Sequence, residues 1–157
     1  MTTTASPVLS TQVIGQAESA LGAILDPLLA GAGITFAQWL VFVITSQAEG
    51  TAVSRDLLIS RITVARNMQA AEVAAAIEEL SAGGLIELAP GTATIRLTID
   101  GRAKFGQVRT QVEQITARLF DLPEQDLATA GRVLSVITAR AKAEAAARVR
   151  SPQRTRV

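Results

Sequence analysis

The residue types that most often carry catalysis are missing from this chain of 157 residues. It contains no His, no Cys and no Tyr. Ser-His-Asp and Cys-His catalysis is therefore excluded, as are zinc fingers, iron–sulfur clusters and His-ligated haem. Glu78 and Glu79 look like a carboxylate pair, but neighbouring residues of a helix diverge by about 100° and do not converge on one substrate. We expect a solvated helix face there, and a protein with no metal, no cofactor and no enzymatic activity.

Basic residues are concentrated in the last third of the chain. Residues 1–50 carry no Lys or Arg, whereas residues 101–157 carry eleven basic and five acidic side chains. The net charge of +1 conceals this imbalance. With 28 Ala and only five aromatic residues, the composition favours helices. The length is typical of one domain, which we expect to span residues 1–157.

One uncharged segment is long enough to cross a bilayer. Residues 27–48 contain no charged side chain, and about 20 apolar residues suffice for a span. Gly31, Gly33 and several polar residues interrupt this segment, so we expect two soluble helices instead. No basic residue precedes Arg55, which argues against a signal peptide. These features predict a cytoplasmic protein without a membrane partner.

Three short helices are predicted in the middle of the chain. Thr35 and Gln38 have the spacing of a capping box, and Ser54 is placed to cap the next helix. The buried set of that next helix is expected to be Leu57, Leu58 and Ile62. A further helix is expected over about residues 69–82. Its inner stripe would consist of Val73, Ile77 and Leu80.

A β-hairpin is predicted directly after these helices. Two runs of strand-forming residues, 85–88 and 94–98, flank a Pro-Gly turn. It is the only sheet that the pattern predicts. Three helices followed by a two-stranded wing are the outline of a winged helix-turn-helix, which would here span residues 35–98. The predicted fold class is therefore mainly α with a short β-hairpin.

Longer helices are expected on both sides of this unit, over residues 10–30 and 100–147, with Pro123 as the first residue of the last helix. Each side carries apolar residues at spacings of three and four, a seam suited to a partner helix. A module of this size cannot cover such seams, so we expect a second copy of the chain to bury them in a C2 homodimer. Residues 1–9 and 148–157 are expected to be flexible tails.

The chain resembles the MarR-type winged-helix regulators. The resemblance covers roughly residues 10–147 and depends on the order and spacing of three motifs. They are Thr35-Phe36-Ala37-Gln38-Trp39-Leu40-Val41, then Glu78-Glu79-Leu80 with Gly84-Leu85, and then Leu97-Thr98 with Gly101. The resemblance implies a transcriptional regulator, expected to be a repressor, that binds an inverted-repeat operator as a homodimer. The fourth helix would enter the major groove and the wing would touch the minor groove.

The resemblance also suggests which residues contact double-stranded DNA. They are Arg61, Arg66, Asn67 and Gln69 near the start of the fourth helix, and Thr94 and Arg96 in the wing. For the first group, an ordinary polar turn is the competing interpretation. For Arg96, it is a cross-strand pair with Glu87. Glu72 either accepts a hydrogen bond from a cytosine amine or simply complements the helix dipole.

MarR-type proteins often bind small aromatic or amphipathic effectors, which weaken their hold on DNA. Four of the five aromatic residues are candidates to line such a pocket here. They are Phe36, Trp39, Phe42 and Phe105. Core packing is the competing interpretation for all four.

An alternative function remains open at this point. Residues 51–97 carry four Arg and five acidic residues, a net charge of −1, and the fourth helix begins with an Ala-rich run that has no basic residue. Because affinity for DNA comes largely from neutralising phosphates, this is an unfavourable composition for a DNA-binding unit. The alternative is a degenerate winged-helix protein that binds other proteins and no specific DNA.

Overall fold

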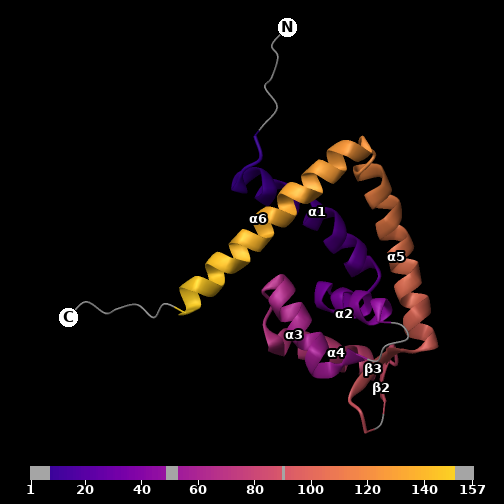
Figure 1. The fold of residues 1–157 in the computed structure, drawn as a ribbon. Helices are drawn as coiled ribbons and strands as arrows, with labels where there is room; N and C mark the ends of the chain where they lie inside the picture. The colour runs from indigo at the N-terminus through magenta and orange to yellow at the C-terminus, as the bar shows by residue number, and fades with distance from the viewer. Residues whose placement is uncertain (1–7, 49–52, 90, 151–157) are drawn as a thin grey trace. The chain divides into compact units, whose positions relative to one another are not determined.

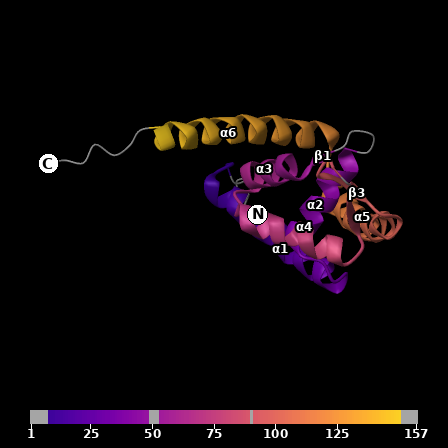
Figure 2. The ribbon, with the colours of Figure 1, turned by 90° about the horizontal axis from the view of Figure 1, so that it is seen from below.

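A computed structural model describes residues 8–48, 53–89 and 91–150 of the chain (Figures 1 and 2). Six helices and three strands follow one another in these residues. They are α1 (Thr11–Gly31), α2 (Phe36–Gln47), β1 (Val53–Ser54), α3 (Arg55–Arg66), α4 (Ala70–Ala82), β2 (Ile86–Ala89), β3 (Thr94–Leu97), α5 (Ile99–Leu119) and α6 (Glu124–Arg150). The prediction of a mainly helical chain with one short hairpin is confirmed.

The chain divides into two compact units, Met1–Gln114 and Ile115–Val157. In the first unit, α2 lies at the centre, with α3 and α4 on one side and the first half of α5 on the other (Figure 1). Val41 and Phe42 of α2 are fully buried. The predicted stripe of α4, Val73, Ile77 and Leu80, is buried as well.

Local capping explains where the central helices begin. The Thr35 hydroxyl accepts from the Gln38 backbone N–H at 3.2 Å, and the Gln38 side-chain oxygen accepts from the Thr35 N–H at 3.0 Å. This is the predicted capping box. The Gln38 amide nitrogen also donates to the Glu79 carboxylate at 2.7 Å, which ties the start of α2 to α4.

Replacing Gln38 with Glu should lower the free energy of unfolding by about 1 kcal/mol. Glu would keep the acceptor of the capping box, but it would set a carboxylate against Glu79 in place of the amide donor. Urea unfolding of the variant measures the loss. Adding Glu79→Gln restores an amide donor opposite the new carboxylate and should recover most of the stability. If the double variant is no more stable than the single one, the bridge between α2 and α4 contributes nothing.

The sheet has one strand that the sequence pattern did not predict. Its order is β1-β3-β2, and both pairings are antiparallel. β1 consists of two residues, with Val53 opposite Ile95 and Ser54 opposite Thr94. Strand β3 is therefore central, and the wing is anchored to the residues just before α3. Ser54 also caps α3 as predicted, since its hydroxyl accepts from the Leu57 N–H at 3.2 Å.

Several predicted boundaries and burials need correction. Leu57 is 45% exposed, because Leu58 and Ile62, four residues apart, form the inward stripe of α3. Pro123 directly precedes α6 and is not its first helical residue. Residues 148–150 continue α6 and do not belong to a tail. The other residues of the predicted tails lie outside the described residues, apart from Val8 and Leu9, which are in no helix or strand.

The long helices carry apolar residues that the single chain leaves uncovered. On α1, Leu21 and Ile24 are 43% and 38% exposed. On α6, Leu134 and Ile137 are 39% and 38% exposed. These are seam positions, so both seams are accessible for a partner. By contrast, Phe105 and Val108 at the start of the α5 seam are buried in the core of the first unit.

The uncharged segment 27–48 does not form one continuous span. It is divided between the end of α1 and α2 by a break at residues 32–35, as predicted. The helix α1 itself, with 21 residues and a mean hydropathy of 1.2 in its most apolar window, is long and apolar enough to cross a membrane by length and composition. It lies near the N-terminus and contains Glu18 and Asp26 within this length.

Candidate nucleic-acid interface

Helices α3 and α4 form a helix-turn-helix. Asn67 ends α3 in the left-handed conformation, with φ of 52° and ψ of 34°, which Asn tolerates better than most residues. Two further residues lead into α4, whose N-cap is Gln69. The Gln69 side chain makes no capping hydrogen bond, so its amide remains at the helix start for other contacts. Because Val73, Ile77 and Leu80 face the core, the opposite side of α4 is exposed.

The two adjacent carboxylates of α4 are exposed, and each one contacts a neighbouring element. Glu78 forms a salt bridge of 3.2 Å with Arg55 at the start of α3. Glu79 accepts from Gln38, as described above. The two carboxylates therefore diverge to different partners, which is consistent with the solvated face predicted for them and not with shared acid–base chemistry. No local pattern in the sequence predicts these partners, because both contacts join residues more than 20 positions apart.

Two of the predicted DNA contacts lie on α3. Arg61 is exposed, and its guanidinium forms no salt bridge within residues 8–48, 53–89 and 91–150. Arg66 is also exposed, and its guanidinium lies 5.8 Å from the centre of the Phe36 ring, a cation–π distance. Both cations are thus available at the surface, while Arg55 is occupied by Glu78.

The wing presents one of its two predicted contacts. Arg96 is exposed and stands directly opposite Glu87 in the hairpin register. No salt bridge joins the two side chains among the described residues, so the alternative of a cross-strand ion pair is not supported. The second residue, Thr94, is not presented at the surface as expected. It is only 6% exposed, because it lies in the central strand between β1 and β2, and its hydroxyl donates to the Thr92 carbonyl.

The base of the wing is held by a compact set of hydrogen bonds. The Thr98 hydroxyl donates to the Gly84 carbonyl at 2.7 Å and accepts from the Gly101 N–H at 3.0 Å. The Arg102 guanidinium donates to the Leu97 carbonyl at 2.8 Å. These contacts fix the direction in which the wing leaves α4 and enters α5. They also explain the Leu-Thr-x-x-Gly motif on which the resemblance partly depended.

Three of the four aromatic candidates for an effector pocket lie in the core. Trp39 and Phe42 of α2 pack against Phe105 of α5, with ring centres 5.3 and 6.1 Å apart. All three are at most 9% exposed and belong to the core, which is the competing interpretation. Phe36 is half-buried and lies under Arg66. Helices α2 and α5 bring the three buried rings together.

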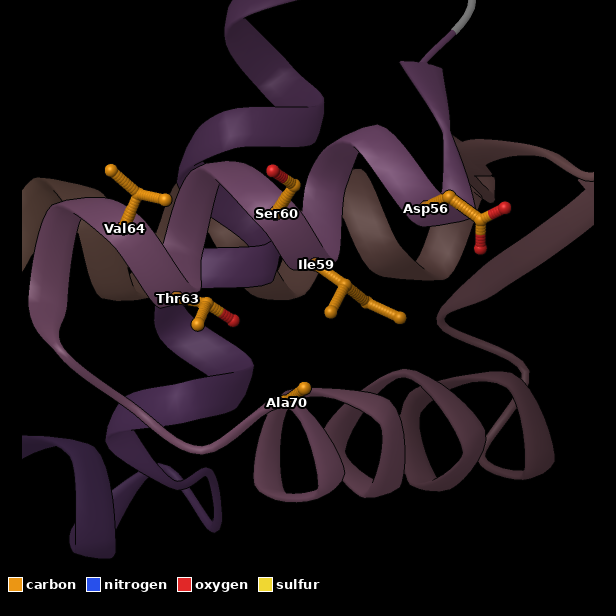
Figure 3. A pocket seen from close by; sticks show the side chains of 6 residues that line it. All are labelled: Asp56, Ile59, Ser60, Thr63, Val64 and Ala70. Atoms are coloured by element: carbon orange, nitrogen blue, oxygen red, sulfur yellow. The ribbon is translucent and has the colours of Figure 1, made fainter. Parts of the chain in front are cut away.

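A shallow pocket of about 320 Å³ lies elsewhere, between α3 and the start of α4 (Figure 3). It is lined by Asp56, Ile59, Ser60, Thr63, Val64 and Ala70. Ile59 and Thr63 point towards Ala70 across the gap (Figure 3). The Thr63 hydroxyl is buried and has no hydrogen-bond partner among the described residues. Among the described residues, no group of three or more acidic side chains lies close enough together to hold a metal ion.

This arrangement defines a winged helix-turn-helix protein. No family model matches the sequence, and no curated protein matches it either. Comparison of the structure with solved structures identifies the MarR-type form of the fold. Sco5413, a MarR family transcriptional regulator from Streptomyces coelicolor, is similar with a TM-score of 0.66 and 18% identity, over 83% of this chain and 91% of that one.

Two further similar structures contain bound partners. CouR from Rhodococcus jostii RHA1, bound to p-coumaroyl-CoA, has a TM-score of 0.67 and 17% identity, over 84% of this chain and 95% of that one. The Mycobacterium tuberculosis MarR family protein Rv2887, in complex with DNA, has a TM-score of 0.63 and 16% identity, over 83% of this chain and 98% of that one. The chain therefore has the MarR-type winged-helix fold, as the sequence motifs suggested.

Proposed function

We propose that this protein is a transcriptional regulator of the MarR type that binds double-stranded DNA in the cytoplasm. The observation that carries the proposal is the helix-turn-helix itself, in which one side of α4 is exposed. Three arginines are also exposed, Arg61 and Arg66 on α3 and Arg96 in β3. A similar fold in complex with DNA supports it. We assign base contacts to Asn67, which ends α3, and to Gln69, the N-cap of α4.

We further propose that the protein acts as a homodimer and as a repressor at an inverted-repeat operator. The uncovered apolar residues of α1 and α6 support the dimer, because exposed seams of this kind are normally buried against a partner. A two-fold dimer places two copies of α4 on successive half-sites. A small aromatic or amphipathic effector would weaken DNA binding. The ligand-bound similar structure supports that part of the proposal, although the core aromatic residues here would not line the site.

Selection of the purified protein against a random-duplex library tests the proposal. We expect an enriched inverted repeat with half-sites about one helical turn apart, roughly 10 base pairs centre to centre. Titration of the enriched duplex at two salt concentrations should then give a steep fall of affinity with salt. Weak binding without sequence preference would contradict the proposal. It would favour a protein-interaction module, for which the exposed Ala residues of α4 and the acidic winged unit are the supporting observations.

A further inference from the structure

The exposed side of α4 carries carboxylates and methyl groups. Residues 70–80 contain no side chain that donates a hydrogen bond. Of the three acidic residues of α4, Glu78 is engaged by Arg55 and Glu79 by Gln38. Glu72 is exposed and makes no salt bridge within residues 8–48, 53–89 and 91–150, so it is the acidic residue of this helix that is left for an external partner.

Two methyl groups lie beside this free carboxylate. Ala71 and Ala75 are both exposed, and they are four residues apart on the helix. Glu72 is three residues from Ala75. Residues spaced by three and four are neighbours on a helix surface, so these three side chains form one continuous patch in the N-terminal half of α4. We refer to Ala71, Glu72 and Ala75 as the α4 patch.

The edges of the four bases differ in what they require from such a patch. Guanine presents two acceptors in the major groove, and adenine presents an acceptor beside a donor, so both are read by side chains that donate. Cytosine presents an amine donor, which a carboxylate can accept from. Thymine presents a methyl group, which packs against apolar side chains such as Ala. A surface of two methyl groups and one carboxylate therefore matches thymine and cytosine best, because it satisfies neither acceptor of guanine and leaves the N7 acceptor of adenine unpaired.

We infer that α4 recognises pyrimidines, with Glu72 accepting from a cytosine N4 amine and with Ala71 and Ala75 contacting thymine methyl groups. The inference rests on the proposed function, since it requires α4 to enter the major groove. It also resolves the unfavourable composition of this helix. Affinity would come from the arginines outside α4, while the helix itself supplies selectivity through groups that carry no positive charge.

Removing thymine methyl groups from the enriched duplex tests the contacts of Ala71 and Ala75. Each thymine of the half-site is replaced in turn by deoxyuridine, which pairs identically but lacks the methyl group. We expect about a fourfold loss of affinity at the contacted thymines, the effect of uncovering one methyl group. At the thymine that Ala75 contacts, the Ala75→Gly variant should bind the thymine and deoxyuridine duplexes with equal affinity, because the methyl group of the protein is already absent.

Ala82→Gly is the matched control, because it removes an exposed methyl group at the far end of the same helix. The Ala82→Gly variant should show the same loss of affinity for the deoxyuridine duplexes as the wild-type protein. Circular dichroism establishes that both glycine variants are folded. If the wild-type protein binds the thymine and deoxyuridine duplexes equally at every position, the methyl contacts are wrong. If the Ala75→Gly variant still loses affinity at every thymine at which the wild-type protein does, the proposed contact of Ala75 is wrong.

Glu72→Gln tests the cytosine contact in a helix of unchanged propensity. Gln can both donate and accept, and it pairs well with adenine. We expect the preference of the wild-type protein for cytosine over adenine at one position of each half-site to fall about tenfold. An unchanged preference at all positions overturns this contact while leaving the proposed function intact. Failure of the library selection to enrich any duplex would overturn both, which distinguishes the two hypotheses.

Discussion

Replacing Gly101 with Ala is expected to lower the free energy of unfolding by about 3 kcal/mol, because this position has no room for a β-carbon. A Cβ built on Gly101 would overlap the carbonyl oxygen of Leu85 and lie 2.8 Å from the carbonyl carbon. Both atoms are backbone, so only a movement of α5 away from the start of the wing can relieve the conflict. That movement would also stretch the hydrogen bonds that the Thr98 hydroxyl and backbone N–H donate to the carbonyl oxygens of Gly84 and Leu85.

Gly106 provides the matched control, since it lies five residues further along α5 and a Cβ there would meet nothing within 4 Å. Ala at this position should raise the free energy of unfolding by about 0.5 to 1 kcal/mol, because Gly is unfavourable in a helix interior. Urea unfolding of the wild-type protein and both variants measures the two effects, which have opposite signs. A Gly101→Ala protein as stable as the wild type would mean that α5 and Leu85 do not approach closely.

Many of the predictions that held have their signal within one short segment of the sequence. The capping box of Thr35 and Gln38 needs only four residues, and the buried stripe of α4 needs only its own periodicity. The Leu-Thr-x-x-Gly motif was visible in the sequence as well. The reason for its glycine was not visible in the sequence, because the carbonyl oxygen that excludes a side chain at Gly101 belongs to Leu85, sixteen positions earlier.

The errors at Leu57 and Pro123 are local, but the missed strand and the burial of Thr94 depend on contacts between distant segments. β1 has two residues, too few for any periodicity, and exists only because β3 pairs with it forty positions later. The same pairing buries Thr94, which looked like an exposed wing residue when only two strands were expected. For Trp39, Phe42 and Phe105, residue type left both a pocket and core packing open, and the packing of α2 against α5 places the three rings in the core.

Substituting Arg61 or Arg96 with Ala is expected to give the largest change in DNA binding. In a homodimer each substitution removes two cations, so the plot of log affinity against log salt should become shallower by about 1.8 if each contacts one phosphate. Since the lines for variant and wild type converge near 1 M salt, this slope difference amounts to a loss of roughly 60-fold at 0.1 M. Fluorescence anisotropy with the enriched duplex at several salt concentrations measures both quantities.

Substitution of other arginines shows whether the change in salt dependence comes from the position of the arginine or only from the loss of a positive charge. Arg109 on α5 is paired with Glu113 and lies about 15 Å along the helix from the base of the wing, so Arg109→Ala should leave the slope unchanged. Arg66→Ala is less informative, because it also removes the contact with Phe36. Because α4 itself carries no cation, the cationic side chains that contact phosphates must come from residues outside it. If Arg61→Ala and Arg96→Ala behave like Arg109→Ala, the interface does not lie on this side of the winged unit.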